Sequence, residues 1–232
     1  MKKKLKNIPK HIAFIMDGNR RWAQRRGLSG ALGHKFGADA LKNIIFTLSK
    51  IEEIKYASFF AFSTENWNRD QKEIDYIFEL VYDFVEKNQE NFNLQNIKFL
   101  AMGDLSRFPK KLQDIILKVE NDTKNNSGLV VNMALNYGGR ADVVQATNKL
   151  LEKGVKTITE QDITQNLYSY PAPDVDLVVR TSGEMRISNF MLFQMAYSEF
   201  YFTKKFWPDF NEKQLNKALL AFSKRNRRFG GK

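Results

Sequence analysis

The 232-residue chain contains no cysteine, which excludes a disulfide framework, a cysteine-ligated zinc site and a thiol nucleophile. It has only two histidines, His11 and His34, and their separation of 23 positions does not give a close-spaced zinc pair. No apolar run approaches the roughly 18 residues of a membrane-spanning helix, and the basic start is not followed by a signal-peptide core. We therefore expect a cytoplasmic protein.

Several familiar motifs of catalysis and nucleotide binding are also missing. The sequence has neither the glycine-rich phosphate loop that ends in Gly-Lys-Ser/Thr nor a G-x-G-x-x-G turn. It lacks the G-x-S-x-G turn of α/β-hydrolases and an aspartate-rich D-D-x-x-D segment. A site for phosphate in this chain must therefore be built from arginines, backbone amides and one or two carboxylates.

Positive charge is in excess, but it is concentrated at the two ends. The net charge is +11, and residues 1–10 and 224–232 carry five cations each and no acid, which leaves +1 for residues 11–223. A nucleic-acid-binding protein is expected to collect its cations on one folded surface. We therefore expect no nucleic-acid partner, and we expect the basic ends to favour peripheral contact with an anionic membrane.

What remains is the pattern of an ordinary α/β protein, with 43% hydrophobic and 27% charged residues. Short β-rich segments alternate with segments of helical period, which predicts a mostly parallel six-stranded sheet flanked by helices. We expect strands at 11–16, 56–63, 96–102, 129–135, 175–180 and 199–203. We expect helices at 34–54, 74–93, 109–126, 139–153, 160–168 and 211–228. No repeat or linker divides residues 1–232, so we expect one catalytic domain with basic segments at 1–10 and 224–232.

Three of the predicted strands end in polar turns, where open parallel sheets bind ligands. The first turn, M-D-G-N-R-R-W at 16–22, combines Asp17 with a glycine and an expected helix start. Free N–H groups there favour an anion, and an adjacent carboxylate fits only if a cation such as Mg²⁺ lies between them. The alternative is that Asp17 simply caps the helix.

The second turn, F-S-T-E-N-W-N-R at 62–69, mixes aromatic and hydrogen-bonding side chains. Such a loop can form one wall of a binding site. Aromatic residues in loops are nevertheless more often packing residues, and the composition of this turn by itself favours packing.

The third turn, R-T-S-G-E-M-R-I-S-N-F at 180–190, places two arginines six positions apart around a tight turn. Guanidinium pairs bind phosphate in a bidentate manner that lysine does not reproduce. Surface pairing of these arginines with Glu184 or Asp176 is the alternative, although surface ion pairs contribute little.

Eight motifs together resemble the cis-prenyltransferases, and most of all the bacterial undecaprenyl diphosphate synthases. They are M-D-G-N-R-R-W-A near the start, G-H-K-F-G-A at 33–38, F-S-T-E-N-W-N-R at 62–69, N-Y-G-G-R at 136–140, the third turn at 180–190, Y-S-E-F-Y-F at 197–202, W-P-D-F at 207–210 and R-R-F-G-G at 227–231. The resemblance runs from about residue 8 to residue 231. It implies a homodimeric, Mg²⁺-dependent enzyme with a hydrophobic tunnel.

The implied reaction adds isopentenyl diphosphate units, with cis geometry, to an allylic diphosphate such as farnesyl diphosphate. The product would be a long-chain polyprenyl diphosphate such as undecaprenyl diphosphate, the precursor of the lipid carrier for cell-wall synthesis. The resemblance leaves open whether a diphosphate oxygen or a carboxylate takes the proton that is lost.

By this resemblance, Asp17 holds Mg²⁺ against the allylic diphosphate, with Glu199 as a second metal-linked carboxylate. The allylic diphosphate would be cradled by Gly18, Asn19, Arg20 and Arg21, with His34 in the same pocket, and Trp22 would be a substrate-binding residue. In the second turn Asn66 and Trp67 would orient the substrates, with Phe62 and Ser63 beside them. Asn19 and Asn66 belong to the set needed for turnover, and residues 69–73, which begin with Arg69, resemble a mobile flap.

The isopentenyl diphosphate would be clamped by Arg180, Arg186 and Ser188. Arg228 and Gly230 match an R-x-G element that reaches into the partner subunit's site. One departure concerns Gly30, because the family usually has arginine there for the allylic diphosphate. Arg25, Arg26 and Lys35 are candidates to replace that contact.

Three other readings compete with this one. A non-catalytic subunit of a heteromeric prenyltransferase would share the fold, but it is expected to lose Asp17 or the arginine pair, and this chain keeps all three. A nucleic-acid module is disfavoured by the nearly neutral body. Another phosphoryl-handling α/β enzyme is disfavoured by the missing phosphate loop.

Overall fold

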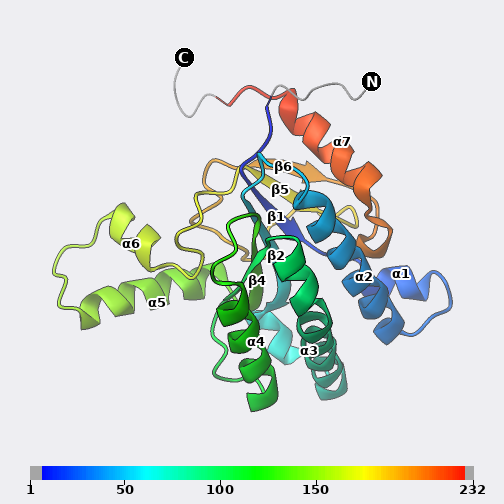
Figure 1. Cartoon of the computed structure of the whole chain (residues 1–232), viewed down its shortest axis with the longest axis horizontal. Coiled ribbons are helices and arrows are strands. Elements are labelled where there is room, and N and C mark those ends of the chain that lie inside the picture. Colours follow the sequence, from blue (N-terminus) through cyan, green and yellow to red (C-terminus); the bar gives the residue numbers. More distant parts are fainter. Residues whose placement is uncertain (1–6, 228–232) are drawn as a thin grey trace.

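The apolar segments form one fully parallel sheet in a computed structural model that describes residues 7–227. The strand order is β3-β4-β2-β1-β5-β6, and Figure 1 shows β1 between β5 and β2. The strands are β1 (His11–Ile15), β2 (Tyr56–Ser63), β3 (Lys98–Met102), β4 (Val130–Tyr137), β5 (Leu177–Arg180) and β6 (Glu199–Phe202). All six expected strands are present, and the predicted fold class is confirmed.

Helices connect the strands, as the alternating pattern predicts. They are α1 (Asn19–Gln24), α2 (Gly30–Leu48), α3 (Gln71–Leu94), α4 (Lys110–Thr123), α5 (Gly139–Glu152), α6 (Glu160–Asn166) and α7 (Glu212–Ser223), with 3-10 helices η1 (Thr64–Asn68) and η2 (Trp207–Asp209). Two helices begin earlier than expected because a cap precedes each apolar stripe. Ser29 accepts a hydrogen bond from the Leu32 N–H, and Asp70 accepts one from the Lys72 N–H. The last helix ends at Ser223, before the expected end near 228.

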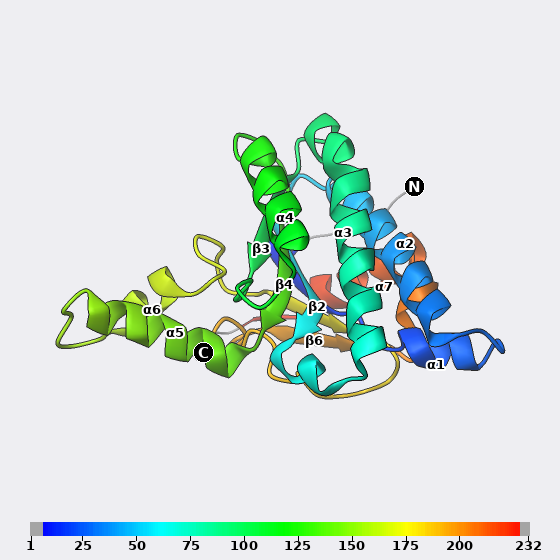
Figure 2. The same ribbon diagram turned by 90° about the horizontal axis from the view of Figure 1, so that it is seen from below.

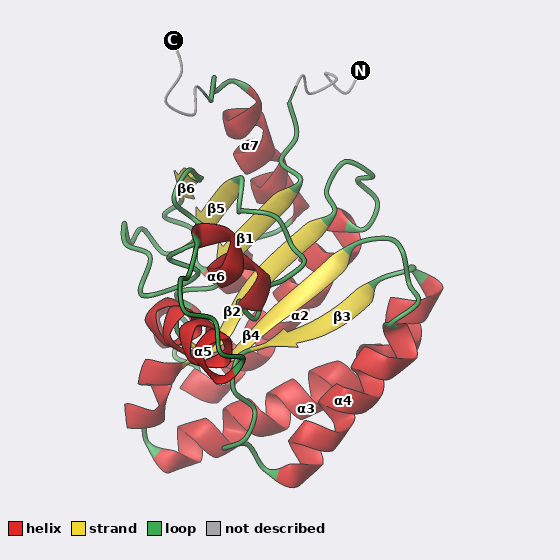
Figure 3. Cartoon of the chain, turned by 90° about the vertical axis from the view of Figure 1, so that its left-hand side faces the viewer, coloured by secondary structure: helices red, strands yellow, loops and turns green. Residues whose placement is uncertain are grey.

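The two faces of the sheet are covered differently. In β1, Ile12 and Phe14 pack into the large core beneath α2, α3, α4 and α7, whereas Ala13 and Ile15 face the other side. That second side is covered by the segment 181–198, which contributes Phe190 and other apolar side chains. Figure 3 shows α2, α3 and α4 behind the sheet, and α5, α6 and irregular chain in front of it. The period of two along β1 therefore separates two unequal cores.

Helices α5 and α6 project from the side of the sheet (Figures 1 and 2). They pack on each other through a small separate cluster that includes Ala146, Leu150, Ile163 and Leu167. Within the described residues, none of the helices is long and apolar enough to cross a membrane.

Strand register brings the polar turns to one edge of the sheet. Ile15 at the end of β1 pairs with Arg180 at the end of β5, and Ser63 at the end of β2 pairs with Tyr137 at the end of β4. Because all strands run in the same direction, their carboxyl ends lie together and the turns that follow face one another.

Candidate active site

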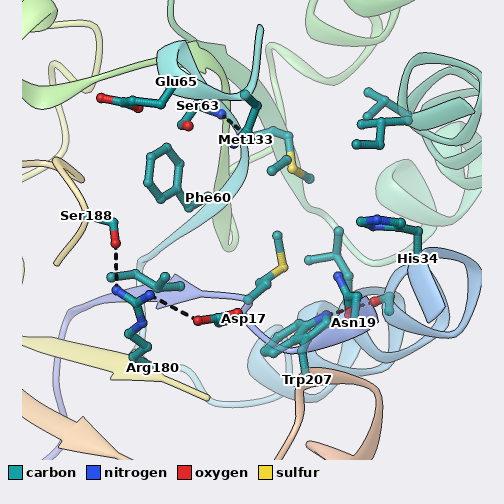
Figure 4. Close-up of a pocket in the computed structure, with 18 of the residues that line it drawn as sticks. Asp17, Asn19, His34, Phe60, Ser63, Glu65, Met133, Arg180, Ser188 and Trp207 are labelled. Atoms are coloured by element: carbon teal, nitrogen blue, oxygen red, sulfur yellow. Dashed lines mark hydrogen bonds and ion pairs between the residues drawn. The ribbon is translucent and has the colours of Figure 1, made fainter. Parts of the chain in front are cut away.

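A cavity of about 910 Å³ opens where β1, β2, β4 and β5 end. Its polar wall is formed mainly by the three turns that the sequence singled out, with His34 and Arg140 added from α2 and α5, and Figure 4 shows Asp17, Asn19, Ser63, Arg180 and Ser188 around it. The polar and charged residues in this wall are Asp17, Asn19, His34, Ser63, Glu65, Asn66, Arg69, Arg140, Arg180, Arg186, Ser188 and Asn189.

The rest of the cavity is apolar and extends between α2 and α3. Leu41 of α2 faces Ile77, Val81 and Phe84 of α3, and Met133 of β4 contributes from the sheet. These side chains come from the apolar stripes of the two helices. A polar mouth therefore continues into a channel suited to a hydrocarbon chain, as the resemblance predicts.

Asp17 lies at the junction of the first and third turns. One carboxylate oxygen accepts a hydrogen bond from Arg180 Nη2 at 3.0 Å, and the other accepts one from Arg21 Nη2 at 3.1 Å. Its side chain does not cap α1, whose N-cap is Gly18. The interpretation of Asp17 as a helix cap is therefore wrong.

Gly18 is required by the backbone and by the space around it. Its φ is 106°, in the left-handed region, and a Cβ there would lie 2.5 Å from the Phe206 ring. A larger residue would push the turn, and Asp17 with it, away from β5.

Arg180 is a buried cation, with a relative exposure of 3%. Besides Asp17, it donates to Ser188 Oγ at 2.8 Å and to the Arg186 carbonyl oxygen. A buried charge needs such partners. Arg180 thus fixes Asp17 and the turn that carries Ser188 to the same strand end.

Arg21 and Arg186 share the carboxylate of Glu184, which joins the first and third turns. Arg21 also donates to Ser182 Oγ at 2.6 Å. The hydrogen bond with Glu184 raises the pKa of Arg21, and the bond with Arg21, followed by that with Arg186, lowers the pKa of Glu184. Arg186 lines the cavity, whereas Arg21 braces the turns from outside it.

Asn19 and His34 both face the cavity and carry buried polar atoms without hydrogen-bond partners, Asn19 Oδ1 and His34 Nε2. Asn19 packs closely on Gly37 of α2, where a Cβ would lie 2.6 Å from Asn19 Oδ1. Burial, followed by the nearby charge of Arg69, lowers the pKa of His34. Its imidazole is therefore neutral near pH 7 and can donate or accept a hydrogen bond.

The expected flap is held by Glu73 of α3. Its carboxylate pairs with Arg69 at 3.0 Å and with Arg20 at 3.4 Å, and it lies 3.6 Å from His34 Nε2. Arg20 lines a smaller side cavity of about 360 Å³ together with Gly30, His34 and Lys72. One carboxylate thus gathers basic groups from α1, α2 and the segment after β2.

In the second turn, Ser63 and Asn66 line the cavity. The Ser63 N–H donates to Asn66 Oδ1 at 3.1 Å as part of a capping box that begins η1. The cap fixes the Asn66 side chain at the cavity wall.

Three aromatic residues predicted at the site lie elsewhere. Phe62 is 1% exposed and packs with Trp67 and Phe78, and the Trp67 indole donates to Asn136 Oδ1 at 2.7 Å. Trp22 packs on Phe36, and its indole donates to Asp209. None of the three predicted aromatics is part of the cavity wall.

Glu199 is not brought next to Asp17 within the chain. It is the first residue of β6 and pairs with Leu177 at the start of β5. It therefore lies at the amino-terminal ends of the strands, whereas Asp17 follows the carboxyl end of β1. Its carboxylate accepts a hydrogen bond from Arg225 at 2.6 Å. Arg228 and Gly230 lie outside the described residues.

The sequence interpretation gave no roles to Glu65, Arg140 and Asn189, although all three line the cavity. A signal was present, because Arg140 ends the N-Y-G-G-R motif and Asn189 directly follows Ser188. Burial alone would raise the pKa of Glu65, but hydrogen bonds, led by that from Asn189, lower it. Glu65 is therefore ionised at neutral pH.

The donor set fits a Mg²⁺ ion that is shared with a diphosphate. Among residues 7–227 no group of three or more histidine, cysteine or acidic side chains forms a metal cage. Mg²⁺ commonly binds through one or two carboxylates plus substrate phosphates and water. Asp17, at the mouth and beside Arg21 and Arg180, would provide such a carboxylate.

A parallel sheet with a cationic mouth and an apolar channel is the architecture of a protein that binds a diphosphate with a hydrocarbon tail. The family model described as "Putative undecaprenyl diphosphate synthase" matches residues 15–230. The chain belongs to this prenyltransferase family and is a transferase of the cis-prenyltransferase type. The predicted resemblance is confirmed.

Relatives of known name match over nearly the full length. An isoprenyl transferase of Fusobacterium nucleatum is 49% identical over 226 residues, covering 97% of each chain. The farnesyl-diphosphate-specific ditrans,polycis-undecaprenyl-diphosphate synthase of Vibrio parahaemolyticus is 45% identical over 230 residues, covering 97% of this chain and 91% of that protein.

Two solved structures show the same fold. Lavandulyl diphosphate synthase from Lavandula x intermedia, in complex with dimethylallyl diphosphate, has a TM-score of 0.92 at 39% identity and covers 96% of this chain and 98% of its own. A probable undecaprenyl diphosphate synthase from Campylobacter jejuni has a TM-score of 0.83 at 36% identity and covers 97% of this chain and 99% of its own.

Proposed function

We propose that this protein elongates farnesyl diphosphate by sequential, cis-selective condensation with isopentenyl diphosphate to give a long-chain product, undecaprenyl diphosphate. One observation carries the proposal: the cavity joins a mouth containing Asp17, Arg180, Arg186 and Ser188 to an apolar channel. Diphosphate groups match the mouth, and a growing hydrocarbon matches the channel. The names of the relatives support the choice of substrates and product.

The two substrates place their diphosphates at different sides of the mouth. The allylic diphosphate is assigned to Asp17, Asn19 and His34, which line the cavity, and to Gly18, Arg20 and Arg21, which border it in the first turn. The isopentenyl diphosphate is assigned to Arg186 and Ser188, with Arg180 between the two sites. Asn66 orients the substrates from the second turn. Holding both substrates in one cavity converts a bimolecular reaction into one within a complex, which can lower the barrier by about 7–11 kcal/mol.

In the reaction, the allylic C–O bond breaks and its electron pair leaves with the diphosphate. The isopentenyl double bond supplies the pair for the new C–C bond, and loss of a proton forms the new double bond. Mg²⁺ held by Asp17 would neutralise charge on the departing diphosphate. Arg21, which is held by Asp17, Glu184 and Ser182, and the backbone N–H groups of the first turn would stabilise the same charge from fixed positions. Arg20 would add a further positive charge beside them. Loss of the diphosphate leaves positive charge on the allylic carbons, and the apolar channel excludes water from them.

Homodimer formation, cytoplasmic location and peripheral membrane contact complete the proposal. The absence of cysteine fits a reducing compartment. The product is a lipid, and the cations at both chain ends favour an anionic membrane surface. In a homodimer, Arg228 and Gly230 of one copy would reach the active site of the other copy. Glu199 would take its metal-linked role at the same place.

The test is incubation with labelled isopentenyl diphosphate and farnesyl diphosphate, with and without EDTA, followed by chain-length analysis. We expect long-chain product that disappears with EDTA and returns with added Mg²⁺. A chain that binds both substrates but forms no product, and gains activity only with a second protein, would instead be a non-catalytic subunit.

A further inference from the structure

Asn189 contacts two other strand-end segments from its place in the third turn. Its Nδ2 donates to Glu65 Oε1 at 2.9 Å, in the segment after β2. Its Oδ1 accepts from the Arg140 N–H at 3.0 Å, at the start of α5 after β4. The side chain thus uses its donor on one segment and its acceptor on the other.

The backbone at Asn189 strengthens the junction. Its carbonyl oxygen accepts from the Gly139 N–H at 2.6 Å. Its φ is 60°, and that of Ser188 is 49°, so the chain turns through the left-handed region at both residues. Asparagine tolerates this conformation better than most residues do. The turn is therefore shaped so that the Asn189 amide bridges the ends of β2 and β4.

The bridge lies in the wall of the cavity, since Glu65, Arg140, Ser188 and Asn189 all line it. Figure 4 shows Glu65 and Ser188 on the same side of the cavity. The first turn is tied to the third by other contacts, between Asp17 and Arg180 and between Arg21 and Glu184. Loss of the Asn189 bridge would therefore disturb one half of the mouth and spare the other.

We propose that Asn189 is a positioning residue for isopentenyl diphosphate, which sets Ser188 and Arg186 in place by anchoring their turn to Glu65 and to the Arg140 backbone. Asn189 acts through these neighbours and forms no bond with the reacting atoms. The inference rests on the proposed assignment of Arg186 and Ser188 to that substrate.

The decisive variant is Asn189→Asp. It keeps the size, the tolerance for positive φ and the acceptor for the Arg140 N–H, but it sets a carboxylate against the ionised Glu65. Asn189→Gly removes the whole amide without imposing a backbone conformation that the residue resists. Asn216→Asp, at an exposed position on α7, is the matched control for added charge.

The partner variant is Glu65→Gln. In Asn189→Asp/Glu65→Gln the glutamine amide can donate to the new carboxylate, so the hydrogen bond is restored with donor and acceptor exchanged. A double-mutant cycle then measures the coupling between the two side chains. Thermal unfolding of each variant reports whether it is folded.

We expect Asn189→Asp to raise the KM for isopentenyl diphosphate at least about fivefold, which is the scale of one lost hydrogen bond. We expect the KM for farnesyl diphosphate to change less than about twofold. In the Glu65→Gln background the same substitution should change the isopentenyl KM by less than about twofold. Asn189→Gly should raise the isopentenyl KM in both backgrounds.

The proposal is overturned if Asn189→Asp leaves the KM for isopentenyl diphosphate unchanged, or if both KM values rise together in a folded protein. It is also overturned if Asn189→Asp raises the isopentenyl KM equally in the unmodified and the Glu65→Gln backgrounds. A variant that does not fold alone but folds and recovers its isopentenyl KM in the double variant supports the coupling. Failure of the proposed function is distinguishable, because then the unmodified protein would form no condensation product.

Discussion

Asp17 is the residue on which the mouth depends most, because the proposed metal ligand is also the partner of a buried cation. The Arg180 side chain is 4% exposed, and Asp17 supplies its only carboxylate partner among the described residues. Asp17 itself is about a quarter exposed, which leaves its carboxylate accessible from the cavity. The same side chain therefore serves both the fold and the chemistry.

Asp17→Ala should reduce turnover at least about a hundredfold, because a metal ion contributes several kcal/mol of charge stabilisation. The variant should also lose about 1–3 kcal/mol of stability, since it leaves Arg180 buried without its carboxylate partner. Product formation and urea unfolding measure the two effects, with Asp39→Ala, at an exposed position on α2, as the control. Retained turnover would contradict the assigned role.

Gly30 is the departure from the family pattern whose consequences the structure clarifies. Two of the candidate replacements are engaged elsewhere, since Arg25 stacks on the Phe206 ring at 4.8 Å and Arg26 on the Trp22 ring at 4.3 Å. Lys35 lines neither described cavity. The missing arginine is therefore not replaced by any of the three.

Gly30→Arg should lower the KM for farnesyl diphosphate, because it adds a guanidinium beside Arg20 in the side cavity, which shares His34 with the main cavity. The substitution is sterically accommodated, since a Cβ would lie 3.5 Å from Arg20 Cγ, an ordinary contact. Gly30→Ala makes the same backbone change without the charge and is the matched control. An unchanged or higher farnesyl KM in the arginine variant, relative to alanine, would show that this contact is not missing.

At the scale of elements, the strands were predictable because each is a short apolar run bounded by turns. Helix starts were less so, because Ser29 and Asp70 cap helices ahead of the apolar stripes. The cover of the second sheet face, formed by residues 181–198, was not predicted. That segment has no helical or strand period, so only tertiary contacts reveal its packing.

The site was predictable where strand ends dictate position. Asp17, Arg180 and Ser188 meet because β1 and β5 are neighbours. For Phe62 and Trp67, the composition of the second turn correctly favoured packing, whereas the resemblance placed them at the site. Their packing partners, such as Phe78 and Phe108, are distant in sequence and could not be named in advance. Likewise, the position of Glu199 depends on the register of β6, which composition does not reveal.

Helices α2 and α3 form the channel, and its width should limit the product. Val81→Phe adds volume to a half-buried position on the channel wall, so growing chains should stop earlier. We expect shorter polyprenyl products with little change in the KM for isopentenyl diphosphate, measured by chain-length analysis. Lys87→Ala, at an exposed position on α3, should leave the distribution unchanged. An unaltered product length for Val81→Phe would place the growing chain elsewhere.

At the scale of the whole molecule, His11 makes stability depend on pH. It is fully buried, with Nδ1 2.7 Å from the Pro173 carbonyl oxygen and Nε2 2.8 Å from Ser58 Oγ. Burial lowers its pKa from 6.5 to about 4. Between these values the unfolded chain binds more protons than the folded protein, so stability falls as the pH decreases.

We expect this histidine to remove about 3 kcal/mol of stability between pH 6.5 and pH 4. Urea unfolding across that range measures the loss. His11→Asn removes the titrating group, so its stability should fall less steeply over the same interval. Identical slopes in the two proteins would show that His11 does not carry the effect.

The charge distribution makes a separate prediction for the whole chain. Because residues 11–223 carry a net charge of only +1, trimming residues 1–8 and 224–232 should sharply reduce retention on heparin. A temperature melt of the trimmed protein controls for its folding. Unchanged elution would place a basic surface on the folded body and revive the interpretation as a nucleic-acid-binding protein.

The central claim is that two diphosphates bind side by side at the carboxyl ends of the strands. The most direct test is a crystal structure with Mg²⁺, isopentenyl diphosphate and an unreactive thio analogue of farnesyl diphosphate. We predict one diphosphate at Asp17 and the Gly18 turn, the other at Arg186 and Ser188, and the farnesyl chain between α2 and α3. Both ligands competing for one position, or either diphosphate bound outside this cavity, would contradict the account.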